Sequence, residues 1–152
     1  MGQYLNSSTL RSNVLASYNG ELERYHIDPY TYQAHHIIPG EVVKYFIETK
    51  YSDSNKEVFN EAWNAILIPS NPEFLTIVHI GSHDRYSKFI KLVLEKSDCL
   101  TYDLYVDLCK MFAEVLQRKF NELNYGSQLT LDQFAEIFLE PVYDQIVSEL
   151  NQ

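Results

Sequence analysis

Apolar residues recur at the spacing of a helix through much of the chain. This pattern predicts helices over residues 41–50, 85–96 and 102–124, and a last helical stretch that opens at Thr130 and breaks near Pro141. The longest of these has the widest apolar stripe, which is expected to be buried. Its members are Leu104, Tyr105, Leu108, Phe112, Val115, Leu116 and Phe120. Most of the fold is therefore expected to be helical.

Two short runs carry the signature of strands instead. Residues 33–39 and 64–69 each pass from a polar start through β-branched or apolar residues to a closing proline. Residues 41–62 lie between these runs, long enough for two helices, with N-cap residues at 52–55 opening the second. Near the N-terminus, apolar residues from Leu10 to Leu15 predict one short amphipathic turn. The expected fold is a mostly helical α+β domain over residues 1–152.

Composition places the chain among folded proteins. Hydrophobic residues make up 45% of the chain, with 12 Tyr and 8 Phe. No apolar run reaches the ~18 residues of a membrane span, and the N-terminus lacks the apolar segment of a signal peptide. Two cysteines are too few for a disulfide scaffold, and Cys109 lies among apolar residues as a core residue would. The net charge of −9 fits poorly with a protein that grips nucleic acid.

Four of the five histidines form two pairs. His35 and His36 are adjacent in the first predicted strand, so their side chains are expected on opposite faces. Two ordinary polar residues would give the same pattern. His79 and His83 have the i, i+4 spacing that suits two ligands of one metal ion. His26 stands alone and receives no role.

These motifs, taken in order, resemble the HNH (ββα-metal) nuclease superfamily. The resemblance rests on Ala34-His35-His36-Ile37-Ile38-Pro39, on Asn64 with Leu67 and Pro69, and on His79-Ile80-Gly81-Ser82-His83 with Tyr86. It is closest to the AHH branch, which occurs in bacterial polymorphic toxins. The resemblance implies a nuclease core over residues 33–95 with a two-stranded hairpin, an inserted helical segment and a metal-binding helix. Residues 97–152 form a helical extension outside it.

The resemblance also implies roles for single residues. His35, His79 and His83 match the metal ligands, and His36 matches the general base. Asn64 matches the residue that holds the histidine-bearing strand and orients the base. Imidazole ligands favour zinc or nickel, although nucleases of this superfamily work with several ions, so one divalent ion (Zn, Ni, Mn or Mg) is expected. Arg85 is a candidate phosphate contact by its position only.

The leading hypothesis is a metal-dependent endonuclease that cleaves DNA, used as a bacterial toxin or effector, with an immunity protein as a partner and no membrane association. Such a protein is either cytoplasmic or secreted without a cleavable signal peptide. The alternative is a non-catalytic metal-binding or protein-interaction module on a degenerate HNH fold, which the acidic charge favours. A zinc hydrolase of another class ranks lower, because the HExxH pattern is absent.

Overall fold

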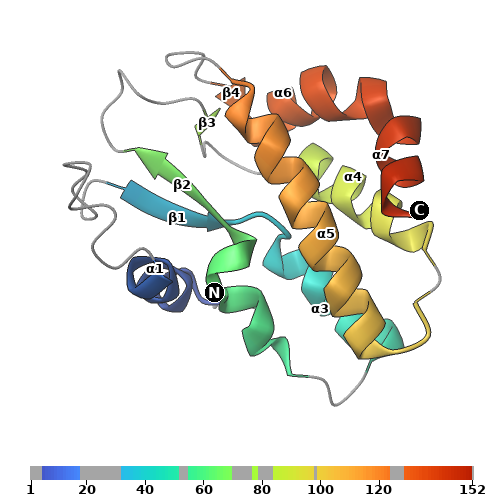
Figure 1. Cartoon of the computed structure of the whole chain (residues 1–152), viewed down its shortest axis with the longest axis horizontal. Helices are drawn as coiled ribbons and strands as arrows, with labels where there is room; N and C mark the ends of the chain where they lie inside the picture. Colours follow the sequence, from blue (N-terminus) through green and yellow to red (C-terminus); the bar gives the residue numbers. More distant parts are fainter. Residues whose placement is uncertain are drawn as a thin grey trace.

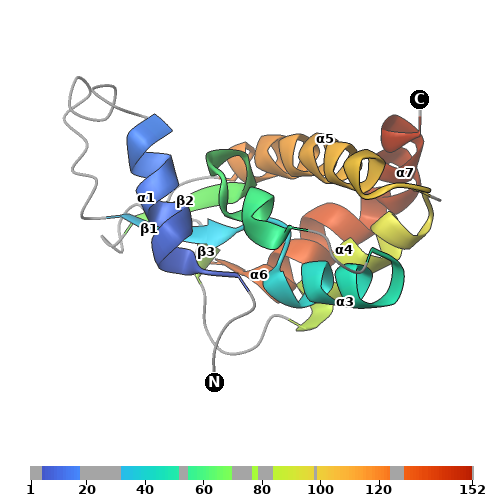
Figure 2. The same cartoon turned by 90° about the horizontal axis from the view of Figure 1, so that it is seen from below.

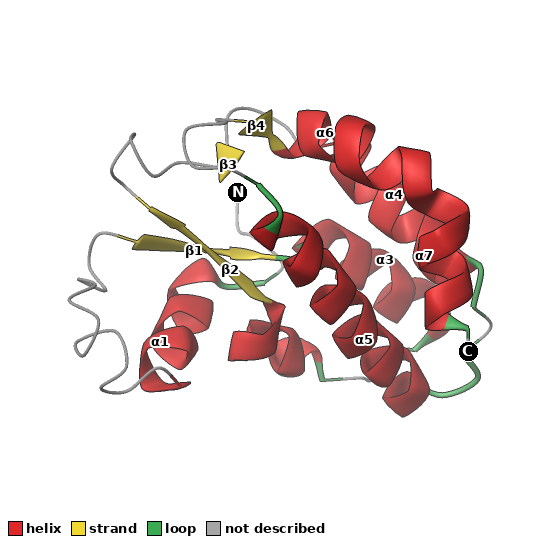
Figure 3. Cartoon of the chain, turned by 45° about the horizontal axis from the view of Figure 1, so that its top comes forward, coloured by secondary structure: helices red, strands yellow, loops and turns green. Residues whose placement is uncertain are grey.

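The computed structural model describes residues 5–17, 32–51, 55–69, 77–78, 84–97, 99–123 and 129–151. Helices dominate these residues, and the strands are few and short (Figures 1 and 3). The protein is a mostly helical α+β fold, as the sequence predicts. Among the helices that the structure describes, none has the length and apolar content needed to cross a bilayer.

The two predicted strands form an antiparallel hairpin. Strand β1 (Tyr32–His36) pairs with β2 (Ala65–Pro69), and His36 lies opposite Ala65 in the register. β1 ends at His36 and not at Pro39. The amide of Ile37 already donates to the carbonyl of Asn64 (3.0 Å), and Pro39 is the N-cap of the next helix. The prediction that the β-branched pair belongs to the strand was therefore wrong, because these residues make the turn into that helix.

The segment between the strands contains helix α3 (Gly40–Lys50) and two 3₁₀ helices, η2 (Lys56–Asn60) and η3 (Ala62–Asn64). α3 buries the four apolar residues that its spacing predicts: Val42, Val43, Phe46 and Ile47. The second predicted helix is wrong in type, since it is split into two short 3₁₀ turns. Its N-cap is nevertheless of the expected kind, because the side chain of Asn55 accepts a hydrogen bond from the Glu57 amide.

An N-terminal helix packs against the hairpin and against the 3₁₀ helices η2 and η3 (Figure 2). This helix, α1 (Ser7–Ser17), is longer than the single turn predicted for the region. Its residues Leu10 and Val14 pack with Ala34 of β1 in a small cluster separate from the main core. The hairpin therefore lies between α1 and the helical body.

The main core lies among α3, α4 (Asp84–Glu95), α5 (Tyr102–Asn121) and the C-terminal helices. α5 buries its predicted stripe except Leu104, which is 52% exposed. Including Leu104 was wrong: it lies in the first turn of the helix and is exposed there, although Leu108, one turn further on, is buried. Cys109 is fully buried, as predicted.

The C-terminal segment is helical with a break near Pro141, as predicted. It comprises α6 (Leu131–Phe134), the π-helical η5 (Ala135–Leu139), the 3₁₀ helix η6 (Glu140–Val142) and α7 (Tyr143–Leu150). Phe134 stacks on Phe120 of α5 with ring centroids 4.4 Å apart. The C-terminal segment therefore shares the main core with α5.

A second, very short sheet ties the C-terminal segment to the part of the chain that precedes α4. Strands β3 (Ile77–Val78) and β4 (Leu129–Thr130) pair in parallel. The sequence did not predict this pairing, because two-residue strands have no measurable alternation. It brings the start of α6 next to the start of α4.

Candidate active site

The adjacent histidines lie on different faces of the hairpin. Ala34, two residues before His36, packs in the α1 cluster, and so does Ala65, which lies opposite His36. His36 therefore shares the α1 face. Ile66 lies opposite His35 and belongs to the main core, so His35 shares the face toward the helical body. Both histidines are half-buried.

His36 is anchored by a side chain from the inserted segment. Its Nε2 lies 2.8 Å from Oδ1 of Asn60, the last residue of η2, and Asn60 is only 1% exposed. Burial lowers the pKa of the His36 imidazole below its ordinary value, and the hydrogen bond to Asn60 offsets part of that shift. Burial therefore favours the neutral ring, which is the form that a general base requires.

Asn64 ties the turn after His36 to the second strand. Its Oδ1 accepts a hydrogen bond from the amide of Ile38 (2.7 Å), and its Nδ2 donates to the carbonyls of Ile38 (3.2 Å) and Phe59 (3.0 Å). Asn64 is fully buried. Together with the bond from Ile37 to its backbone carbonyl, these contacts fix the backbone directly after the histidine pair.

The first turn of α4 is fastened beside this turn. The hydroxyl of Tyr86, which is buried, donates to the carbonyl of Ile37 (2.7 Å). The amide of Tyr86 donates to the side chain of Asp132 in α6 (2.8 Å). α4 is thus positioned from both sides, against the end of β1 and against the C-terminal segment. His79 and His83, the predicted ligands that precede α4, lie outside the described residues.

Arg85 is committed to the C-terminal segment. Its Nε and Nη2 donate to the two carboxylate oxygens of Glu140 (2.5 and 2.9 Å), and its Nη1 lies 3.5 Å from Glu136. The guanidinium is about half exposed. A phosphate would have to replace these carboxylates, so Arg85 is not a preformed phosphate contact.

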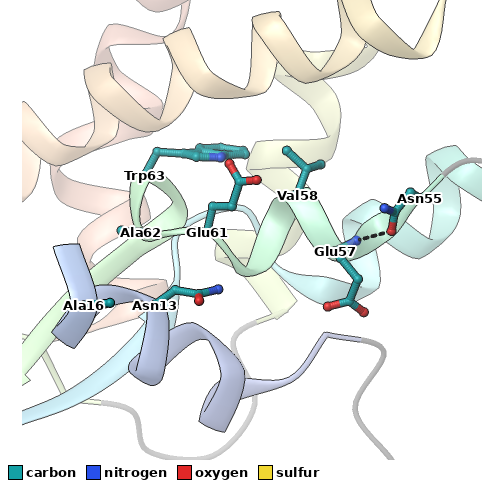
Figure 4. A pocket seen from close by; sticks show the side chains of 8 residues that line it. All are labelled: Asn13, Ala16, Asn55, Glu57, Val58, Glu61, Ala62 and Trp63. Atoms are coloured by element: carbon teal, nitrogen blue, oxygen red, sulfur yellow. Dashed lines mark hydrogen bonds between the residues drawn. The ribbon is translucent and has the colours of Figure 1, made fainter.

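An acidic cleft of about 710 Å³ opens between α1 and the 3₁₀ helices η2 and η3 (Figure 4). It is lined by Asn13 of α1, by Glu57 and Glu61, and by Trp63 of η3. The carboxylates of Glu57 and Glu61 make this cleft a poor place for a phosphate group. It instead exposes the carboxylate of Glu57 to solvent, and Glu57 in turn contacts Asn60 (2.9 Å).

The structure describes only part of the predicted set of metal ligands. Within the described ranges, no group of three or more His, Cys, Asp or Glu side chains is arranged to bind an ion. Of the three predicted ligands, His35 is described, on the hairpin face toward the helical body. The predicted donor set of three imidazoles would fit zinc, nickel or a similar ion better than magnesium.

Comparison with known proteins identifies the family. Residues 18–101, more than half of the chain, match AHH, which is described as a nuclease family of the HNH/ENDO VII superfamily with a conserved AHH motif. The chain belongs to the AHH family. It is accordingly a nuclease that acts on nucleic acid, and the resemblance drawn from the motifs is confirmed. No curated protein and no solved structure gave a match.

The AHH motif itself is Ala34-His35-His36, and the structure adds residues around it that motif reasoning missed. Asn60 contacts the His36 ring, and Glu57 contacts Asn60. Asp132, far along the chain, accepts a hydrogen bond from the amide of Tyr86 in the first turn of α4. A buried asparagine in a 3₁₀ turn has no local signature beyond a polar residue in an apolar segment. Tyr86 stood in the quoted motif, but no role was assigned to it.

Proposed function

We propose that this AHH nuclease is a metal-dependent endonuclease that hydrolyses phosphodiester bonds in DNA. In this proposal His35, His79 and His83 hold one divalent ion, and His36 is the general base. The observation that carries the proposal is the division of the AHH histidines between two faces of β1, directly before a turn that Asn64 and Tyr86 hold in place.

His36 would take the proton from the water that attacks phosphorus. A base needs a fixed ring and an available lone pair near neutral pH. The half-buried ring, its hydrogen bond to Asn60 and its lowered pKa supply these conditions. Asn64 supports the base indirectly, because its side chain fixes the backbone two residues after the ring.

The metal ligands would be assembled from two elements that the fold holds together. His35 comes from β1, and His79 and His83 come from the segment that leads into α4. Tyr86 of α4 donates to the carbonyl of Ile37 and so fixes the position of α4 relative to the end of β1. A bound divalent ion would supply charge stabilisation for the scissile phosphate and for the departing 3′-oxygen.

The acidic net charge favours the second candidate, a metal-binding or interaction module without catalysis. With −9 overall, and with Arg85 paired to Glu140 and Glu136, the protein offers little electrostatic attraction to a polyanion. Catalysis and simple binding are separated by whether the intact protein turns over substrate.

A role as a secreted or cytoplasmic bacterial toxin, with an immunity protein as partner, follows from the AHH resemblance and belongs to the nuclease proposal.

The test is cleavage of supercoiled plasmid DNA with Mg²⁺, Mn²⁺, Ni²⁺ or Zn²⁺ by the intact chain and by two variants. His36→Ala is expected to reduce the rate by about 10²- to 10⁴-fold, the usual contribution of a positioned base, while it still binds metal. His35→Ala is expected to lose both cleavage and metal binding. His26→Ala is the matched control, because no role is assigned to that histidine.

Excess EDTA is expected to abolish cutting by the intact chain, and added metal to restore it. Metal binding without cleavage of DNA or RNA under any ion would refute the catalytic proposal in favour of the binding module. Cleavage of RNA alone would support the nuclease assignment and show that the substrate is RNA and not DNA. Undiminished cutting by His36→Ala would show that another group is the base.

A further inference from the structure

The side chain of Asn60 makes three polar contacts at the junction of η2, β1 and the segment before α1. Its Oδ1 lies 2.8 Å from Nε2 of His36 and 3.2 Å from the backbone nitrogen of Asn6. Its Nδ2 lies 2.9 Å from Oε2 of Glu57. These contacts use both ends of an amide that is almost completely buried.

Two of the three contacts fix which end of the amide is oxygen. The backbone N–H of Asn6 can only donate, so it requires the amide oxygen. The ionised carboxylate of Glu57 can only accept, so it requires the amide nitrogen. A flipped Asn60 would set donor against donor and acceptor against acceptor. The oxygen therefore faces His36.

The orientation of the amide determines the proton on the imidazole. Because the oxygen of Asn60 can only accept, Nε2 of His36 must carry the hydrogen. In a neutral ring the lone pair then belongs to Nδ1. Nδ1 accepts no hydrogen bond from the residues that the structure describes.

We propose that Asn60 is a positioning residue that holds His36 as the Nε2–H tautomer and so leaves Nδ1 as the atom that takes the proton from water. This inference rests on the proposed role of His36 as the general base. Asn60 touches neither substrate nor metal in this account. It acts through the ring that it orients, and Glu57 acts through Asn60.

The N-terminal segment supports the same arrangement from the other side. Besides the amide of Asn6, the side chain of Asn13 in α1 donates to the backbone carbonyl of Asn60 (2.8 Å). Both residues lie outside the 18–101 range that matches the family. The amide of Asn6 thus helps to orient the side chain of Asn60, whereas Asn13 holds only the backbone of residue 60.

The tautomer is measured directly on the full metal-free chain, with ¹⁵N-labelled histidine and long-range ¹H–¹⁵N correlation. The His36 signals are assigned by their loss in His36→Gln. We expect a pyrrole-type shift at Nε2 and a pyridine-type shift at Nδ1 at a pH where the ring is neutral. A proton on Nδ1, or equal occupancy of both tautomers, would overturn the proposal. This measurement does not depend on cleavage, so it separates failure of this inference from failure of the proposed function.

The kinetic test exchanges the amide and the carboxylate between residues 60 and 57. Asn60→Asp keeps an acceptor opposite Nε2 of His36 but sets a second carboxylate against Glu57. The repulsion is expected to turn the side chain of residue 60 away from the ring, so we expect kcat to fall by roughly 10- to 100-fold with little change in KM, within the contribution of a positioned base. Combining Asn60→Asp with Glu57→Gln restores a donor opposite the acceptor, so we expect it to recover most of that loss. Glu57→Gln by itself is a mild variant, because Glu57 is exposed.

Asn13→Ala is the matched control. It removes a hydrogen bond to the backbone of residue 60 but leaves the amide of Asn60 facing His36. We expect it to lower the unfolding midpoint slightly and to leave kcat unchanged. If the single and paired exchanges both fold and lose kcat equally, or if neither loses any, Asn60 is a structural residue and the proposal fails.

Discussion

Asn64→Ala tests how the turn after the histidine pair is held. The substitution removes three buried hydrogen bonds and leaves the N–H of Ile38 and the carbonyls of Ile38 and Phe59 without these partners. At a net value of about 1 kcal/mol for each bond, the expected loss in the free energy of unfolding is about 3 kcal/mol. Domains have about 5–15 kcal/mol in total, so the variant should remain folded at room temperature but be marginal.

The assay is urea denaturation followed by circular dichroism, with the free energy extrapolated to water and the slope compared between proteins. Asn55→Ala is the control: it also removes an asparagine, but one that makes a single exposed N-cap bond worth about 1 kcal/mol. A loss for Asn64→Ala no larger than that of the control, with an unchanged slope, would refute the view that Asn64 fastens this turn. The same result would remove the structural reason for assigning Asn64 to the active site.

Three further outcomes follow from the packing and the charges. Phe134→Ala should destabilise the fold by about 3–5 kcal/mol in the same urea assay, because it removes a fully buried aromatic ring. Glu140→Gln should leave Arg85 ion-paired with Glu136 alone and so tighten binding to labelled oligonucleotides severalfold at low salt, as read by fluorescence anisotropy; no change would show that Arg85 does not contact nucleic acid. Burial raises the pKa values of Cys109 and Tyr105, so their neutral forms are favoured by folding. The melting temperature should therefore fall as the pH rises past their unfolded pKa values of about 8.5 and 10, and Cys109 should react with a thiol reagent only on unfolding.

The hairpin and the main helices were predictable because each has a repeating pattern long enough to read. The four buried residues of α3 recur at a 3.6-residue period, and β2 is an apolar run that closes on Pro69. Where the pattern is short, it fails. The second helix predicted in the insert, after the N-cap residues at 52–55, is instead split into two 3₁₀ turns at Glu61, whose backbone is extended.

The histidines of the AHH motif can be picked out from the sequence, but the contacts that hold them cannot. An AHH motif identifies two histidines by type and order, without reference to what surrounds them. The contacts of Asn60 join residues 6, 36 and 60, which only the folded chain brings together. The cap that Asp132 supplies to α4 spans a similar gap in sequence. Such long-range polar contacts have no local period, so no reading of one segment reveals them.

The net negative charge of the protein is compatible with nuclease function if a cationic side chain such as Arg85 is only weakly paired with its carboxylates. Arg85 is about half exposed, as are Glu136 and Glu140, and ion pairs between exposed groups contribute little to stability. The guanidinium can therefore exchange its carboxylates for a phosphate at small cost, and salt weakens both contacts. Binding would then be modest and salt-sensitive, and specificity for the scissile phosphate would come from the metal and from the oriented His36. A nuclease of this kind relies on the geometry of its site more than on long-range attraction to its substrate.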